Sequence, residues 1–249
     1  MIYIGIPVHN EGRTIGVQLW KIRKVMAEFG RPYEVSVFDD ASTDGTSQTL
    51  ANYVGRLPLR VTRSEIRAGY GLAIERLIRS VVARSTYPKR DVAVTLQGDF
   101  SEDPTALVAM VKTIEGGADL VAGSPSPIGS SVPRPVRIGR GLAPLVLGRA
   151  FAQAPVTDPL SGFRAYRVIV LKKAVRQLGN GERLLAAAGW GANLELLCRV
   201  ASHARRIEEE PFPLGVLGRE RESRFRAFPG LRELVGLRST VWPPAHERS

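Results

Sequence analysis

Short apolar runs alternate with longer amphipathic segments over the first 123 residues of the chain. The apolar runs predict strands, and they cover Ile2–Pro7, Glu34–Phe38, Leu59–Thr62, Asp91–Leu96 and Asp119–Ala122. Apolar positions at helical spacing follow each of the first four runs, over Thr14–Phe29, Thr46–Val54, Gly71–Arg84 and Pro104–Ile114. This alternation predicts an α/β fold with a mostly parallel sheet and helices on both faces.

The pattern changes after residue 123. Residues 124–135 are rich in Ser, Pro and Gly and predict a loop, and a basic, apolar helix is expected over Ile138–Phe151. A turn is expected over Val156–Phe163, followed by one or two helices up to about residue 187. Another helix is expected over Trp190–Ala204 and a last strand over Arg206–Pro211. A weakly amphipathic segment, Phe228–Leu237, lies in the arginine-rich tail.

The two halves of the chain differ in their balance of charged residues. The chain has 249 residues, 44% apolar and 24% charged, as in ordinary soluble proteins, with a formal net charge of +11. Residues 1–120 hold 15 Lys and Arg against 14 Asp and Glu, whereas residues 121–249 hold 20 against 10. Within 121–181 nine cations accompany a single acid, Asp158. The second half is therefore expected to meet an anion: nucleic acid, a phosphate or a membrane surface.

Several classes of protein are disfavoured by what the chain contains. A single cysteine, Cys198, cannot form an internal disulfide framework or a cysteine-based zinc site, and three scattered histidines do not suggest a metal cluster. The N-terminus does not resemble a signal peptide. The longest apolar stretches are interrupted by Arg149 and by Asn193 and Glu195, so no membrane span is expected. A cytoplasmic location is the resulting expectation.

Acidic loops follow three of the predicted strands. They read PVHNE at 7–11, DDASTDG at 39–45 and QGD at 97–99. Because ligands of parallel sheets bind beyond the carboxyl ends of the strands, these loops predict a binding site. The alternative is that the loops only cap helix N-termini, which suits Ser42 and Asp44. It suits Asp39 and Asp40 less well, since adjacent carboxylates repel each other without a compensating cation or donor.

Six motifs in order resemble the inverting family-2 glycosyltransferases with a GT-A fold: PVHNEG, FDDASTDGT, RAGYGLAIERLI, LQGDFSEDP, GADLVAGSP and DPLSGFRAYR. The last is most similar to the dolichyl- or polyprenyl-phosphate mannose (or glucose) synthase group. The resemblance covers about residues 2–225. It implies a single GT-A (Rossmann-like) domain over 1–225, with a nucleotide-sugar half at 1–123, an acceptor half at 124–225, and a separate tail at 226–249.

The resemblance also implies where the donor binds. Base, ribose and diphosphate would contact the strand-end loops, through Pro7, His9, Glu11, Asp39, Asp40, Ser42, Gln97 and Asp99. The family's metal motif is D-x-D, but here Gln97 replaces the first aspartate. We expect Mg²⁺ or Mn²⁺ at Asp99 and Gln97, with Asp99 catalytic and Ser101 in support, because such an ion neutralises the departing diphosphate.

On the acceptor side, the arginine-rich segment suits a phosphate, because guanidinium groups bind phosphate oxygens in pairs. The acceptor residues implied by the resemblance are Arg137, Arg140, Ser161 and Arg164, with Asp158 as a second catalytic residue that orients or deprotonates the acceptor. Arg149 and Arg167 are expected to be bystanders. A C-terminal element that resembles the family's diphosphate-closing segment contributes Arg219, Ser223 and Arg224.

These features predict an inverting glycosyltransferase that moves a sugar from a GDP-mannose or UDP-glucose type of donor to a polyprenyl or dolichyl phosphate. Its expected partners are the nucleotide-sugar, a lipid-phosphate acceptor and an anionic membrane surface to which it attaches peripherally. One alternative is the same donor chemistry on a soluble hydroxyl or phosphorylated small molecule. Another is a non-catalytic module that binds nucleic acid or an anionic surface. We expect no nucleic acid, since basic patches interleaved with stacking aromatics are missing.

Overall fold

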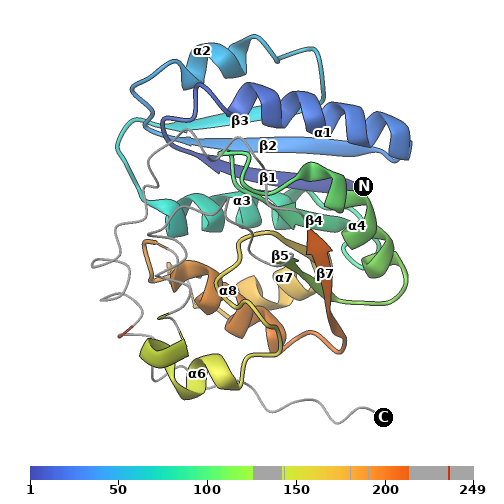
Figure 1. Ribbon diagram of the computed structural model, residues 1–249, viewed down its shortest axis with the longest axis vertical. Helices are drawn as coiled ribbons and strands as arrows, with labels where there is room; N and C mark the ends of the chain where they lie inside the picture. The colour runs from blue at the N-terminus through green and yellow to red at the C-terminus, as the bar shows by residue number, and fades with distance from the viewer. Residues whose placement is uncertain (126–141, 143, 180, 190, 213–234, 236–249) are drawn as a thin grey trace.

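The computed structural model describes residues 1–125, 142, 144–179, 181–189, 191–212 and 235, which build one seven-stranded sheet (Figure 1). The strands are β1 (Ile2–Val8), β2 (Tyr33–Asp40), β3 (Leu59–Ser64), β4 (Val92–Thr95), β5 (Leu120–Pro125), β6 (Arg164–Arg167) and β7 (Ile207–Phe212). Their order across the sheet is β3-β2-β1-β4-β6-β5-β7. All pairs are parallel except those that β6 makes with β4 and β5.

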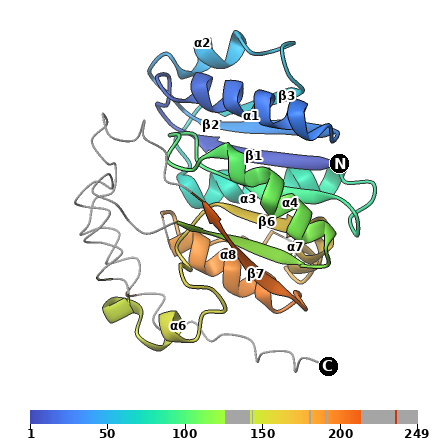
Figure 2. The same ribbon diagram turned by 45° about the vertical axis from the view of Figure 1, so that its right-hand side comes forward.

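Helices cover both faces of this sheet, as the apolar pattern predicted (Figure 2). They are α1 (Ile15–Phe29), α2 (Thr46–Ala51), α3 (Tyr70–Arg84), a 3-10 turn η1 (Pro104–Ala106), α4 (Leu107–Glu115), α6 (Arg149–Ala152), α7 (Val168–Arg176) and α8 (Gly191–Ala201). Side chains that alternate along a strand enter different cores. On β1, Ile4 packs in the core with α1 and α4, whereas Tyr3 packs in the core with α3, α7 and α8. The central strands β1 and β4 are buried on both faces, which explains their continuous apolar runs, whereas the edge strand β3 is largely exposed.

The predicted strands and helices of the first half are all present, with small differences at their ends. The largest miss is β6, which lies where the sequence pattern predicted a turn followed by helices. Its four residues, RAYR, carry too little pattern to identify a strand, yet Ala165 and Tyr166 are fully buried on opposite faces between β4 and β5. The chain turns into α7 immediately after Arg167.

The helix expected over Ile138–Phe151 is not continuous in its described part. Residues 144–147 are helical, but Gly148 has φ +52° and separates them from α6. A left-handed residue ends a helical run, and glycine adopts that conformation at little steric cost. The segments 126–135 and 228–234, on which a loop and part of an amphipathic tail were predicted, lie outside the described residues.

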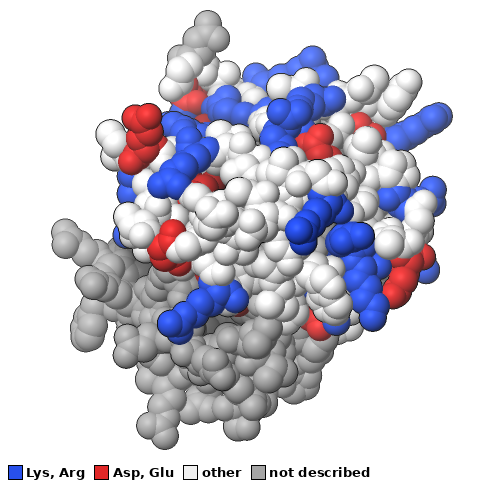
Figure 3. All heavy atoms as spheres, turned by 90° about the horizontal axis from the view of Figure 1, so that it is seen from above, with Lys and Arg blue, Asp and Glu red and all other residues white. Residues whose placement is uncertain are grey.

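The surface over α2, β3 and α1 mixes charges of both signs, as Figure 3 shows. Lys and Arg side chains are scattered there among Asp and Glu rather than gathered into one patch, in line with the near balance of charges in the first 120 residues. Within the part of the chain that the structure describes, no helix is long and apolar enough to cross a bilayer.

Among the described glycines, Gly71 at the start of α3 has the least room for a side chain. Gly71 N donates to Ala188 O at 3.2 Å, and a Cβ atom at Gly71 would lie 1.9 Å from Ala187 O. Gly69, with φ +89°, is the N-cap residue just before it. The glycines of the GYG sequence therefore let the 187–188 backbone lie directly against the first turn of α3.

We expect Gly71→Ala to lower the free energy of unfolding by about 3 kcal/mol, at the upper end of typical overpacking costs, because backbone must move to admit the methyl group. Urea unfolding measures it. The matched control is Gly116→Ala, where φ is −71° and the new Cβ meets its nearest neighbours at an ordinary 3.4 Å. Equal effects in the two variants would contradict the close approach at Gly71.

Candidate active site

The carboxyl ends of β1, β2 and β4 meet at one edge of the sheet, and the three acidic loops lie there together. Val8 at the end of β1 pairs with Asp39 on β2, and β4 pairs with the other side of β1. Pro7 is part of this edge as a half-buried residue of β1 opposite Phe38. The structure therefore brings together all the residues predicted to bind the donor.

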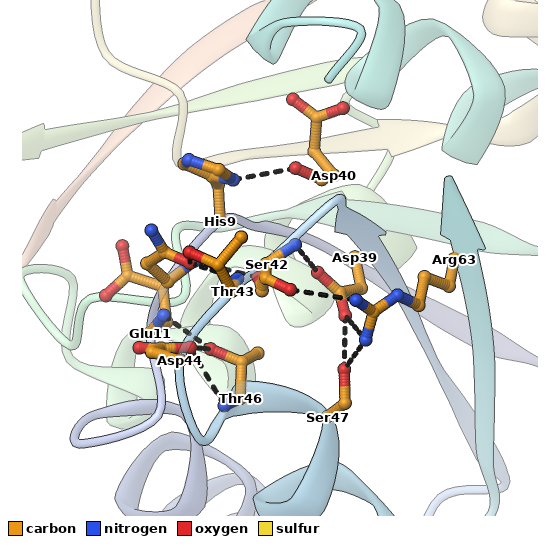
Figure 4. Close-up of polar contacts among 11 residues, drawn as sticks. His9, Glu11, Asp39, Asp40, Ser42, Thr43, Asp44, Thr46, Ser47 and Arg63 are labelled. Carbon is orange, nitrogen blue, oxygen red and sulfur yellow. Dashed lines mark hydrogen bonds and ion pairs between the residues drawn. The ribbon is translucent and has the colours of Figure 1, made fainter. Parts of the chain in front are cut away.

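The loops after β1 and β2 are fastened to each other by hydrogen bonds (Figure 4). Ser42 Oγ accepts from Asn10 N at 2.8 Å, and Asn10 Oδ1 accepts from Thr43 N at 2.7 Å. The remaining cross-links run from Glu11 N to Thr46 Oγ1 (2.7 Å), from Gly12 N to Asp44 Oδ2 (3.1 Å) and from His9 Nδ1 to Asp40 O (2.7 Å). Residues that are 31 to 35 positions apart in the chain are thus held together in one hydrogen-bonded unit.

Asp44 lies one residue before Gly45, the N-cap position of α2, and it still satisfies a free helical N–H as the capping interpretation anticipated. Its carboxylate accepts from Thr46 N at 2.9 Å, at the first residue of α2, and also from the Thr46 hydroxyl and from Gly12 N. Burial raises the pKa of Asp44, but these hydrogen bonds outweigh it and hold the pKa below its usual value.

Asp39 is almost fully buried, and its carboxylate has its own donors. It accepts from Ser42 N at 2.9 Å and from Ser47 Oγ at 2.8 Å, and it pairs with Arg63 Nη1 at 3.5 Å. Arg63 also donates to Ser42 O at 2.8 Å, so its guanidinium spans the mouth of the β2 loop (Figure 4).

Asp40 points away from Asp39, because consecutive strand residues face opposite sides of the sheet (Figure 4). Its two oxygens accept from Ala68 N at 2.6 Å and Gly69 N at 2.9 Å, just before α3. Contrary to the expectation from repulsion, each of the two carboxylates is compensated within the protein, so their adjacency alone does not require a ligand.

Three residues of these loops adopt left-handed backbone conformations. They are Asn10 (φ +53°), Ala41 (φ +57°) and Phe100 (φ +59°), one after each of β1, β2 and β4. Residues with a Cβ lose about 1–2 kcal/mol in this region, Asn least. Such strain persists where surrounding contacts impose it, and it is typical of ligand sites.

The loop after β4 holds the predicted metal residues Gln97 and Asp99, both half-buried. Asp99 Oδ1 accepts from Ser101 N at 3.0 Å and from Ser101 Oγ at 2.6 Å, so Ser101 orients the carboxylate. Glu102, which the sequence analysis did not single out, is buried and accepts from Gln97 N at 2.8 Å.

Among the described residues no group of three His, Cys, Asp or Glu side chains could hold a metal by itself. One carboxylate and one amide oxygen nevertheless suit Mg²⁺ or Mn²⁺ when substrate phosphates supply further oxygens, which is how Mg²⁺ is commonly bound. The donor set at Asp99 and Gln97 therefore fits an ion that arrives with a diphosphate.

The predicted acceptor residues are placed unevenly. Asp158 Oδ1 accepts from Leu160 N at 3.0 Å, and Asp158 O accepts from Ser161 N at 3.2 Å, which closes a tight turn. Ser161 is buried, and its hydroxyl has no hydrogen-bond partner among the described residues. The other predicted residues lie outside the described part of the chain: Arg137, Arg140, Arg219, Ser223 and Arg224.

Direct contact between Arg164 and an acceptor phosphate does not agree with the structure. The side chain is fully buried on β6, where Nη1 donates to Asn193 O at 2.5 Å and Nη2 to Pro159 O at 2.6 Å. Its guanidinium fastens the turn before β6 to α8. Arg167, an expected bystander, pairs with Asp119 at 3.0 Å away from the strand-end loops.

Asn193 and Tyr70 are the polar residues that sequence reasoning missed in this region. Tyr70 OH donates to Asn193 Oδ1 at 2.9 Å, and Asn193 Nδ2 donates to Leu160 O at 3.0 Å. The signal for Asn193 was present in the sequence, since it is the polar break in an apolar helix that served only to exclude a membrane span.

Comparison with known proteins gives one family and several distant relatives. Residues 3–175 match the family described as Glycosyl transferase family 2. A dolichol-phosphate mannosyltransferase from Pyrococcus furiosus is 23% identical over 225 residues, 86% of this chain and 56% of that protein. A dodecaprenyl-phosphate galacturonate synthase from Rhizobium johnstonii is 28% identical over 112 residues, 44% of this chain and 31% of that protein. The chain thus spans between 31% and 56% of the length of these curated relatives.

Solved structures show the same fold. Glucosyl-3-phosphoglycerate synthase from Mycobacterium tuberculosis, in complex with Mn²⁺, UDP and phosphoglyceric acid, superposes with a TM-score of 0.67 at 22% identity, covering 98% of this chain and 80% of that one. At this identity the likeness concerns the fold alone, and it confirms the expected GT-A architecture.

Proposed function

The chain belongs to glycosyl transferase family 2, and from this premise we propose that it transfers a sugar from a nucleotide-sugar to a polyprenyl phosphate, with inversion. The single observation that carries the proposal is the edge of the sheet where the loops after β1, β2 and β4 meet. They present carboxylates on a cross-linked and strained backbone, where α/β sheets bind nucleotides.

In this proposal the β1 and β2 loops bind the nucleoside. Asp39 uses only part of its accepting capacity on Ser42, Ser47 and Arg63, because a carboxylate offers about four lone-pair sites. It can therefore accept from a base N–H as well, and Glu11 can accept from ribose hydroxyls. The donor would be of the UDP-glucose or GDP-mannose type.

Asp99 and Gln97 would hold a divalent ion together with the diphosphate. When bound, such an ion acts as a Lewis acid that stabilises the charge on the leaving group. Ser101 keeps the Asp99 carboxylate oriented for this role, and the hydrogen bond from Gln97 N to buried Glu102 fixes the loop that carries both ligands. The Mn²⁺ named with the Mycobacterium tuberculosis enzyme supports the assignment.

A lipid phosphate is the acceptor we propose, because curated relatives carry polyprenyl phosphates in their names. A phosphate oxygen would attack the anomeric carbon from the face opposite the diphosphate, and the nucleoside diphosphate would leave with the electron pair of the broken C–O bond. The basic segment, with Arg137 and Arg140, would hold the acceptor phosphate, while Asp158 orients it. Peripheral attachment to an anionic cytoplasmic membrane surface belongs to the same proposal.

A second candidate has the same donor chemistry with a soluble acceptor. It is favoured by the solved structures of glucosyl-3-phosphoglycerate synthase, which has a similar fold and was crystallised with phosphoglyceric acid. With a hydroxyl acceptor a base is required, and Asp158 would supply it.

Asp39→Asn should weaken binding of UDP- or GDP-sugars about tenfold to a hundredfold, the effect of losing one charged hydrogen bond of about 1.5–3 kcal/mol. Isothermal titration calorimetry measures the affinity. The amide keeps one oxygen for Ser42 N, so the loop can retain its shape. Asp91→Asn is the matched control: this buried aspartate precedes β4, at the opposite end of the strand from the loops. Unchanged affinity in Asp39→Asn would remove Asp39 from the donor site.

Asp99→Asn should lower kcat by about a hundredfold or more while changing donor affinity much less, because charge stabilisation is needed most as the diphosphate departs. A radiolabelled-sugar transfer assay with added Mn²⁺ gives kcat. The control is Asp103→Asn, which removes the carboxylate that caps η1 four residues further on. Full activity of the wild type in EDTA would exclude the proposed ion.

The acceptor is tested by comparing Arg140→Ala with Asp158→Asn. For a polyprenyl phosphate, Arg140→Ala should raise the acceptor KM about tenfold to a hundredfold, and Asp158→Asn should be mild. For a hydroxyl acceptor, Asp158→Asn should cost about 10²–10⁴ in rate and Arg140→Ala little. Arg176→Ala removes an exposed cation of the same basic segment and serves as the control. A large effect of Asp158→Asn with a small effect of Arg140→Ala would contradict the lipid-phosphate acceptor and support a soluble hydroxyl acceptor.

A further inference from the structure

A buried polar cluster joins the acceptor turn to the start of α3. Asn193 on α8 is 2% exposed and lies at its centre. Its side-chain oxygen accepts from Tyr70 OH at 2.9 Å, its side-chain nitrogen donates to Leu160 O at 3.0 Å, and its main-chain oxygen accepts from Arg164. Every hydrogen-bonding group of the asparagine amide except one N–H is thus directed at the turn or at Tyr70.

The turn has no room to relax against this cluster. A Cβ atom on Gly162 would lie 2.6 Å from Tyr70 OH and 3.2 Å from Asn193 Nδ2. Gly162 O also accepts from Thr95 Oγ1 at 2.7 Å, which anchors the same residue to the end of β4. The tyrosine hydroxyl therefore touches the backbone of the turn as well as the side chain that holds it.

Tyr70 is equally tied to the donor side. It is the first residue of α3, and the two amides just before it, at Ala68 and Gly69, donate to the carboxylate of Asp40 at the end of β2. Burial, and next the charge of nearby Glu102, raise the pKa of Tyr70, so its hydroxyl remains a protonated donor. Glu102 belongs to the loop that carries Asp99.

We infer that Tyr70 is a positioning residue that holds the Asp158–Ser161 acceptor turn in register with the donor loops, by way of Asn193. The hydrogen bonds form a continuous path. Asp40 accepts from the amides at 68 and 69, directly before Tyr70, and the Tyr70 hydroxyl donates to Asn193. Asn193 in turn donates to Leu160 O, inside the turn that Asp158 closes. The inference rests on the proposed function, because that function makes this turn part of the acceptor site.

The role of the Tyr70 hydroxyl is seen by comparison with phenylalanine at the same position. Phenylalanine would fill the same space, so packing alone does not need the oxygen. Among the described residues the hydroxyl supplies the one donor to the buried Asn193 side-chain oxygen, and a buried acceptor left without a donor is unfavourable. Without it the asparagine amide can rotate and release Leu160 O.

Tyr70→Phe tests this with two readouts. Hydrogen exchange, followed by NMR, should accelerate about tenfold at the amides of Leu160 and Ser161, which bond to Asp158 only while the turn is closed. Steady-state transfer to farnesyl phosphate, with whichever of UDP-glucose and GDP-mannose the wild type uses, should show an acceptor KM raised about tenfold while the donor KM stays within about twofold. In an Asn193→Ala background, Tyr70→Phe should cause little further change in exchange rate or acceptor KM, because both residues act on the contact with Leu160 O.

Tyr87→Phe is the matched control, because it deletes the hydroxyl of a tyrosine that is 65% exposed. Unchanged exchange at Leu160 and Ser161 in Tyr70→Phe overturns the inference. Faster exchange with unaltered acceptor kinetics also overturns it, since Tyr70 would then be only structural. A wild type that transfers sugar to no acceptor refutes the proposed function instead, and the exchange measurement still decides whether Tyr70 holds the turn.

Discussion

Parallel pairing of β1 with β2 and β4 is the constraint on which the whole site depends. A parallel strand must return to the same edge before it can pair again, so every loop after these strands opens on one side. The candidate site residues therefore lie together at this edge, although they are spread over about 90 positions of the chain, from Pro7 to Asp99. Hydrogen bonds between the first two loops then fix their relative positions, and these contacts surround the left-handed residues Asn10 and Ala41.

The acids of the site differ in what they do for the protein itself. Asp44 caps a helix, Asp40 binds the two amides that precede α3, and Asp39 is balanced by Arg63 and two neutral donors. Asp99 is oriented by one neighbouring residue, through the Ser101 amide and hydroxyl. Capping and ligand binding therefore do not exclude each other: in this loop cluster the same carboxylates serve the fold and, in the proposed function, form the binding edge.

How far the sequence predicts the structure depends on the length of the pattern. Strands buried on both faces and helices of fifteen residues gave signals strong enough to place the sheet, its faces and the loops that carry Asp39 and Asp99. The four residues of β6 gave none, since its partners are set by tertiary contacts. Arg164 was misjudged because a cationic side chain in a basic segment suggests an anion, whereas burial turns its guanidinium toward main-chain carbonyls. Tyr70 and Asn193 become meaningful only when helices far apart in sequence touch.

The antiparallel strand β6 has a consequence for how the chain acquires its shape. β4 and β5 are consecutive strands, yet β6 lies between them and is made about 40 residues later. During synthesis, the β4 edge of the sheet β3-β2-β1-β4 therefore stays unpaired until residue 167 has left the ribosome. An unpaired strand edge can pair with other chains. The nucleotide half and the acceptor half, separable in the proposed chemistry, are thus interlocked in folding. A protein cut at residue 123 would keep β4 and the first four residues of β5 but lose the strand that joins them.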